Sequence, residues 1–142
     1  MASKPTEPSQ SVMSSLEAWG NSPLAPMGLA TLVTALHFRP LQLRPMLCVP
    51  PLVFASYANL QGFKIDGAGV AAAASGAYAV MGLRRRRQQR GGLRARFSAR
   101  GAVRGVAIGL AAANLVADGW VYATGDRDAE ARERADNPRW AE

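Results

Sequence analysis

The sequence predicts an all-α fold: a small helical membrane protein with four transmembrane or membrane-embedded helices, in two hairpins joined by a short turn. Only 19% of the 142 residues are charged, whereas 49% are hydrophobic, and soluble domains carry about 25% charged residues. The apolar residues gather in separate runs, and the excess positive charge lies in the connections between the runs. This distribution favours a bilayer over water as the surroundings of the helices.

Residues 1–23 are rich in serine and proline and contain no arginine. We expect a flexible N-terminal segment here. The first apolar run, residues 24–38, carries no charged residue. Pro26 suits the first turn of a helix, because the N–H that proline lacks has no helical partner there. The first helix is therefore predicted over 24–38.

Two further uncharged runs follow, over residues 46–63 and 67–83, with a short polar turn at 64–66 between them. The first is about long enough to cross the hydrocarbon core of a bilayer. Pro50 and Pro51 would kink such a helix in water, but in a membrane neighbouring helices can satisfy the freed carbonyls. We predict helices over both runs.

The fourth helix is predicted over residues 101–123, and a polar C-terminal tail over 124–142. Glycines recur every seven residues before the basic connection and every four residues after it. Small residues let membrane helices approach closely. We therefore expect helix-packing roles, within the bundle or toward a partner, for Gly62, Gly69, Gly76, Gly101, Gly105 and Gly109.

A basic loop over residues 84–100 joins the third and fourth helices. The stretch from 84 to 104 holds nine arginines and no acidic residue. The connections after the first and third helices carry charges of +2 and +9, whereas the N-terminal segment carries −1, the 64–66 turn 0 and the segment from Asp118 onward −3. Four crossings place both basic connections on one side, so the positive-inside rule sets the orientation. The topology-setting, lipid-facing residues of the loop are Arg84, Arg85, Arg86, Arg87, Arg90, Arg94 and Arg96.

The same arginines allow other interpretations, which the sequence leaves open. Anionic lipid at the basic face is compatible with the membrane placement. An arginine-rich RNA-binding protein is the rival reading, because clustered arginines attract any nucleic acid electrostatically. Phe97 is the single aromatic residue between 84 and 104, so a stacking platform for bases is missing. We therefore expect no nucleic-acid partner.

The residue types for catalysis are scarce. One cysteine, Cys48, and one histidine, His37, exclude cysteine-based zinc sites and leave little for a catalytic triad. We expect no enzymatic activity, no catalytic residues, no cofactor and no metal. Asn114 and Asp118 are polar positions within the membrane segment: we expect an interhelical hydrogen bond from Asn114 and a location at the membrane interface for Asp118, beside Trp120.

Three local patterns resemble one known family. They are Ser22-Pro23-Leu24-Ala25 at the start of the first apolar run; Asp66-Gly67-Ala68-Gly69 opening an alanine-rich helix that carries Tyr78 and ends in arginines; and Ala112-Ala113-Asn114-Leu115-Val116 followed by Tyr122-Ala123-Thr124-Gly125. Over about residues 22–125 the chain resembles the fungal altered inheritance of mitochondria protein 19 family. The resemblance implies a small multi-pass mitochondrial membrane protein without an assigned reaction. Heavier use of alanine and a more arginine-rich loop set this chain apart.

Together these observations predict a non-enzymatic protein of the mitochondrial inner membrane, with the basic loops toward the matrix and both termini in the intermembrane space. We expect it to act as a scaffold, assembly or accessory component of a larger membrane complex that affects mitochondrial maintenance or inheritance. Its expected partners are the lipid bilayer and other membrane protein subunits. A component of a protein-import or transport assembly is the first alternative, and the RNA-binding protein is the second.

Overall fold

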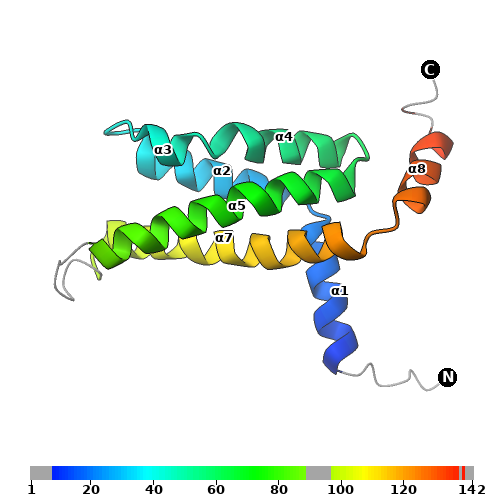
Figure 1. Cartoon of the computed structure of the whole chain (residues 1–142), viewed down its shortest axis with the longest axis horizontal. Helices are drawn as coiled ribbons and strands as arrows, with labels where there is room; N and C mark the ends of the chain where they lie inside the picture. Colours follow the sequence, from blue (N-terminus) through cyan, green and yellow to red (C-terminus); the bar gives the residue numbers. More distant parts are fainter. Residues whose placement is uncertain (1–7, 89–96, 138, 140–142) are drawn as a thin grey trace.

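The computed structural model describes residues 8–88, 97–137 and 139, and within these ranges the chain is helical with no strand. The longest helices run side by side along the long axis of the molecule (Figure 1). The elements are α1 (Pro8–Gly20), α2 (Leu24–His37), α3 (Leu43–Met46), α4 (Val49–Leu60), α5 (Lys64–Gln88), α7 (Ala99–Thr124) and α8 (Arg127–Asp136). The all-α fold class is therefore confirmed.

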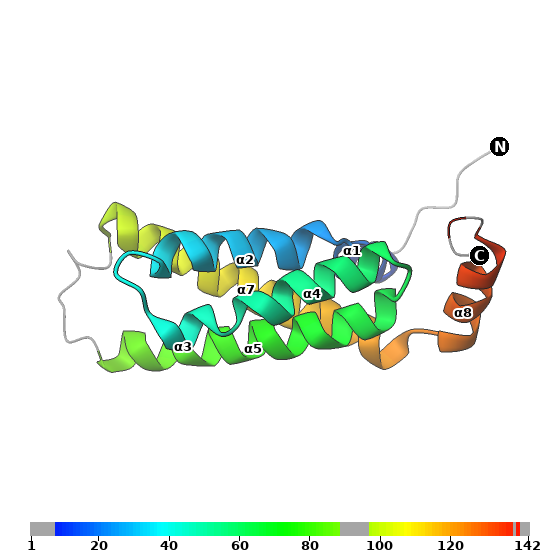
Figure 2. The ribbon, with the colours of Figure 1, turned by 90° about the horizontal axis from the view of Figure 1, so that it is seen from above.

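Helices α2, α4, α5 and α7 form the bundle. α5 packs against both α4 and α7, and α2 packs against the same two helices from the opposite side. Figure 2 shows the four helices from above, with α8 lying beyond one end of them. The last turns of α5 and the first turn of α7 lie at the other end of the bundle, together with α3 (Figure 1).

The interior of the bundle is built mainly from alanine. Leu29, Val33 and Leu52 are the largest apolar side chains that are fully buried. Many large apolar side chains instead point outward, among them Phe54, Tyr57, Leu60, Val80, Val106 and Val116. Buried small residues bring helix backbones close together, and large exposed apolar residues in this number are unusual on a monomer surrounded by water.

The helices follow the apolar runs, but some of them begin or end at other residues than predicted. α2 coincides with the first run to within one residue, and α5 extends beyond the third run at both ends, to Lys64 and Gln88. In the second run α3 ends at Met46 and α4 covers Val49–Leu60, so α3 lies almost entirely before the run. Pro50 and Pro51 lie in the first turn of α4, where proline replaces amides that have no helical acceptor. The prolines therefore begin a helix and do not kink one.

The expectation of a flexible segment over residues 1–23 is wrong for the part that the structure describes. Residues 8–20 form α1, which packs on α7 and stands across the long axis of the bundle (Figure 1). Leu16 and Trp19 lie one helical turn apart and face Ala113 and Val116 of α7. This apolar contact, rather than helix propensity, holds a helix in a serine-rich stretch.

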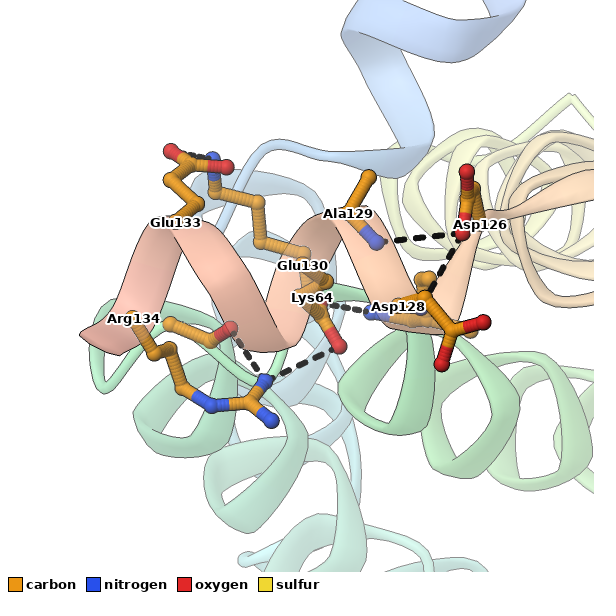
Figure 3. A network of polar contacts seen from close by, with 9 residues as sticks. Lys64, Asp126, Asp128, Ala129, Glu130, Glu133 and Arg134 are labelled. Atoms are coloured by element: carbon orange, nitrogen blue, oxygen red, sulfur yellow. Dashed lines mark hydrogen bonds and ion pairs between the residues drawn. The ribbon is translucent and has the colours of Figure 1, made fainter. Parts of the chain in front are cut away.

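The polar tail expected over 124–142 contains α8. Asp126 caps this helix, because its Oδ1 accepts hydrogen bonds of 3.0 Å from the backbone N–H groups of Asp128 and Ala129. Such a side-chain cap satisfies amides that the first turn leaves without partners. Figure 3 shows the cap beside the contacts that hold α8 against the bundle.

Helix α8 is fixed by Glu130 and Arg134. Glu130 Oε1 accepts a 2.8 Å hydrogen bond from the backbone N–H of Ile65, in the first turn of α5. Arg134 Nη1 lies 3.1 Å from Glu130 Oε2, donates to the Gly62 carbonyl at 3.1 Å and stacks its guanidinium over the ring of Phe63. Figure 3 shows this network, in which a carboxylate from α8 caps the N-terminus of α5.

The membrane part of the fold prediction is only partly supported. Of the described helices, α7 alone has the length and hydropathy needed to cross a bilayer, while α2 is apolar but shorter. At 1.5 Å per residue, the 14 residues of α2 extend about 21 Å, short of a hydrocarbon core of about 30 Å. The structure therefore supports one candidate span.

The closest backbone contact between α4 and α5 provides a test of the packing. A Cβ at Gly67 would lie 2.9 Å from the Ala55 carbonyl oxygen and 3.3 Å from the Asn59 amide nitrogen. Gly67→Ala should therefore lower the free energy of unfolding by about 1–3 kcal/mol, because the two backbones must separate. The measurement is the thermal unfolding midpoint of the purified protein. The control is Gly119→Ala on α7, where a Cβ meets open space; equal midpoints for the two variants would contradict this packing.

Candidate functional site

The first candidate site is a polar contact in the interior of the bundle, made by the side chain of Asn114. Its side chain is completely buried. Trp19 Nε1 donates to Asn114 Oδ1 at 2.9 Å, and Asn114 Nδ2 donates to the Ala25 carbonyl at 3.1 Å. One amide thus joins α1, α2 and α7, and both of its polar atoms are used within the fold.

The expected location of Asp118 at the membrane interface stays a prediction. Within the bundle its side chain is buried, with 1% of its surface exposed. The reason is its register: it shares a stripe with Ala107, Ala111, Asn114 and Val121, and Trp120 lies on a different face. Its Oδ2 has no hydrogen-bond partner among the described residues. A buried carboxylate oxygen in this state is costly when ionised.

The glycines before the basic connection have different surroundings. A Cβ at Gly69 would meet the Tyr122 ring at 2.6 Å, and one at Gly76 would meet Leu115 at 3.2 Å. Both glycines therefore lie where α5 contacts α7. Gly62 does not pack between helices: it has φ 85° and ends α4, with Phe63 N–H bonded to the Ala58 carbonyl. This is the turn in which glycine is favoured after a helix.

The glycines on α7 lie away from the core stripe of that helix. Gly101 donates its backbone N–H to Ser98 Oγ at 3.2 Å, within the N-terminal cap of α7. A Cβ at Gly105 would lie 3.0 Å from Nη2 of Arg86, and one at Gly109 would meet nothing within 4 Å. The glycines with four-residue spacing thus lie on an outward face of α7, and Arg86 of α5 lies across this face at Gly105.

The second candidate site is a cavity of about 570 Å³ at the end of the bundle where α5 ends and α7 begins. We call it the basic cavity. Six arginines line it: Arg44, Arg84, Arg85, Arg86, Arg100 and Arg104. They come from α3, α5 and α7, so the fold gathers cations that the sequence spreads over 61 positions.

The predicted loop arginines separate into three groups. Arg84, Arg85 and Arg86 lie on the last turns of α5 and line the basic cavity, whereas Arg87 does not line it; all four side chains are exposed. Arg90, Arg94 and Arg96 lie outside the described residues. The first group therefore belongs to a helix end and a cavity wall, where the sequence predicted a loop.

Two buried rings close the basic cavity toward the bundle. His37 and Tyr78 both line it and pack edge to face, with ring centroids 5.8 Å apart. His37 Nδ1 lies 2.9 Å from the Val33 carbonyl oxygen. His37 is buried, with 5% of its surface exposed. Met81 and Ile108 complete an apolar wall.

Neither site has the composition of a catalytic or metal centre. The described part of the chain contains no group of three or more His, Cys, Asp or Glu residues that could hold a metal ion. Cys48 is buried and not in a disulfide. Amide, guanidinium and aromatic groups of this kind can bind or position a ligand.

Some contacts at these sites had a signal in the sequence that we did not use. Val12, Leu16 and Trp19 follow the spacing of one helical face, which indicates an amphipathic helix in the N-terminal segment. Glu130 and Arg134 have the i,i+4 spacing of a helical ion pair. Which amide Trp19 would reach, and which helix end Glu130 would cap, depends on tertiary structure and carries no local signal.

A scan of protein families and searches of curated proteins and solved structures gave no match to this chain. The family membership expected from the sequence therefore stays a prediction. Any function must be inferred from the polar contact at Asn114, the basic cavity and the outward faces of the helices.

The hydrogen bond between Trp19 and Asn114 can be tested by Trp19→Phe. This change leaves Asn114 Oδ1 buried without the indole donor, at a cost of about 1–3 kcal/mol. We expect faster amide hydrogen exchange throughout α1 and a lower unfolding midpoint, because α1 has few other buried contacts. Trp120→Phe, at an indole of α7 that is 36% exposed, is the control. Unchanged exchange in α1 would show that the hydrogen bond does not hold this helix.

Proposed function

We propose that this chain is a non-enzymatic protein of the mitochondrial inner membrane that serves as a scaffold, assembly or accessory subunit of a larger membrane complex. The observation that carries the proposal is the distribution of side-chain size. Small and polar residues fill the interior, among them Ala111, Ser75 and Asn114, while large apolar residues cover the outside. Lipid can solvate such an outer surface, whereas in water it would favour aggregation.

The charges of the described residues support an orientation along the long axis. Arginines gather at the end where α5 and α7 meet. The opposite end carries paired charges, with Lys64 bound to Glu133 and Arg134 to Glu130. A bilayer between these ends would place the arginines on the side favoured by the positive-inside rule, which is the matrix side in this proposal.

Some of the helices are long enough to cross a bilayer in this orientation, and others are too short. α5 and α7 have 25 and 26 residues, about 38 Å each, which exceeds the hydrocarbon thickness. α3 and α4 follow each other along the same edge of the bundle (Figure 1), and α2 is shorter still. In our proposal α2 and α3–α4 are embedded in the membrane and are covered at their ends by lipid headgroups and by neighbouring subunits.

The outward face of α7 supports the proposed scaffold role. Ala102, Val106 and Gly109 form an exposed stripe on this helix. Close helix–helix contacts in membranes use small residues of this kind. The stripe has no partner within the described chain at Gly109, so we assign it to contact with a helix of another membrane subunit.

The membrane placement predicts resistance to alkaline carbonate and unequal labelling of the two ends. In a Cys48→Ala background, Phe97→Cys reports the basic end and Ala131→Cys the α8 end; both positions are exposed. In mitochondria stripped of the outer membrane, an impermeant maleimide should label position 131 and spare 97 until detergent is added. Release of the protein by carbonate would overturn the membrane placement. Labelling of 97 alone would invert the orientation.

The accessory role predicts a large complex that depends on the face around Gly109. Gly109→Leu should leave the isolated chain stable, since a side chain meets open space there, and should shift the protein from a high-mass complex to its monomer mass on native gels. Gly28→Leu is the control, because Gly28 on α2 is also open. A wild-type protein that migrates only as a monomer after mild detergent extraction would contradict the proposal.

A further inference from the structure

The described residues around the basic cavity concentrate positive charge without protein anions. Among them there is no Asp or Glu. Both ion pairs found among the described residues, Lys64–Glu133 and Arg134–Glu130, lie at the opposite end of the bundle. Six guanidinium groups around one cavity repel each other. A setting of this kind is stabilised by an anion from outside the chain.

One of these arginines is also incompletely bonded. Nε of Arg104 is buried and has no hydrogen-bond partner in the part of the chain that the structure describes. A buried N–H of a cation that lacks an acceptor is costly. Arg85, by contrast, donates to Gln42 Oε1. The unmet donor of Arg104 on a cavity wall points to an acceptor supplied by a ligand.

Helix ends contribute to the same field. The first turn of α7 lines the basic cavity through Arg100 and Gly101, and the positive end of its dipole therefore faces the cavity. The C-terminal turns of α5 carry the opposite partial charge, which stabilises Arg85, Arg86 and Arg87 on that helix. The α5 dipole explains why arginines are tolerated there, but it does not provide a hydrogen-bond acceptor for Arg104.

The size and the lining define the class of ligand. A volume of about 570 Å³ lies within the usual range for small-molecule sites, about 300–1,000 Å³. Arginine forks match phosphate oxygens in two-point contacts. The wall formed by Tyr78, Met81 and Ile108 is apolar on the bundle side. We propose that the basic cavity binds a compact phosphate-bearing anion with at least two negative charges.

The geometry disfavours a nucleic-acid strand as the occupant. Phe97 is 82% exposed and does not line the basic cavity. Tyr78 is buried and packs on His37, so its ring is not free for stacking on a base. Two sources of the phosphate remain chemically equivalent at the arginines: an anionic lipid headgroup and a soluble phosphate compound. The site does not depend on the proposed membrane function, because the soluble compound needs no bilayer.

The test compares two double variants of the full-length protein purified in a neutral detergent. Arg86→Gln with Arg104→Gln removes two cavity charges. Arg39→Gln with Arg87→Gln removes two charges from exposed arginines of the same end that do not line the cavity. The probes are inorganic pyrophosphate, measured by titration calorimetry, and phosphatidic acid in mixed micelles, measured against phosphatidylcholine.

We expect the cavity variant to lose affinity by about tenfold or more, since it removes charge-assisted hydrogen bonds, and the control variant to stay within about twofold of the wild type, a change expected of exposed charges. Binding of both probes shows that the phosphate alone is recognised. Binding of phosphatidic acid without pyrophosphate assigns the site to a lipid headgroup. If the cavity variant does not fold, as judged by its unfolding midpoint without ligand, Arg104→Lys takes its place.

Three results would overturn the proposal. The first is that neither probe binds the wild-type protein. The second is an equal loss in the two double variants, which would reduce the effect to net charge at that end. The third is tighter binding of a single-stranded RNA oligonucleotide than of either probe, with equal dependence on both arginine pairs. Loss of the membrane topology in the labelling experiment would leave the outcome with pyrophosphate unaffected, so the two proposals fail separately.

Discussion

Close approach of helix backbones is the constraint on which the rest of this structure depends. Gly67 lies against the Ala55 carbonyl, and Gly20 lies against the Ala117 carbonyl, at distances that leave no room for a Cβ. An interior of alanine and glycine buries little apolar area per residue, so the usual hydrophobic driving force in water is weak. Dispersion contacts between backbones and a few internal hydrogen bonds then supply the packing energy. The large apolar side chains, excluded from so narrow a core, are left on the outside.

The sequence predicted the elements well wherever the signal was local. Uncharged runs located α2, α5 and α7, and the arginines correctly indicated one strongly basic end. The failures concern which face of a helix meets which neighbour. Gly62 and Gly69 belong to one seven-residue repeat, yet the first ends a helix in a turn and the second lies under Tyr122. The spacing of residues in the sequence indicates that they would share one face of a helix, but it does not indicate whether a helix continues between them.

The candidate sites were less predictable for the same reason. The basic cavity requires Arg44 from α3 to lie near Arg104 of α7, a proximity set by helix packing. Asp118 is buried because it follows Ala111 and Asn114 on the inner stripe, although its neighbours in sequence suit an interface. The N-terminal helix was hidden by composition: serine and proline indicate a loop, and the contact of Trp19 with Asn114 outweighs that preference.

The cap on α5 has a consequence for how the chain reaches its final form. The N–H of Ile65 is bonded to a carboxylate 65 positions further along the chain, and Trp19 is bonded to an amide 95 positions ahead of it. Residues made earlier in synthesis thus wait for partners that are made later. The α4–α5 hairpin and α1 must remain incompletely bonded until α7 and α8 have emerged, and long-range contacts of this kind form slowly. During that interval the unfinished helices are the part of the chain most prone to misfolding and aggregation.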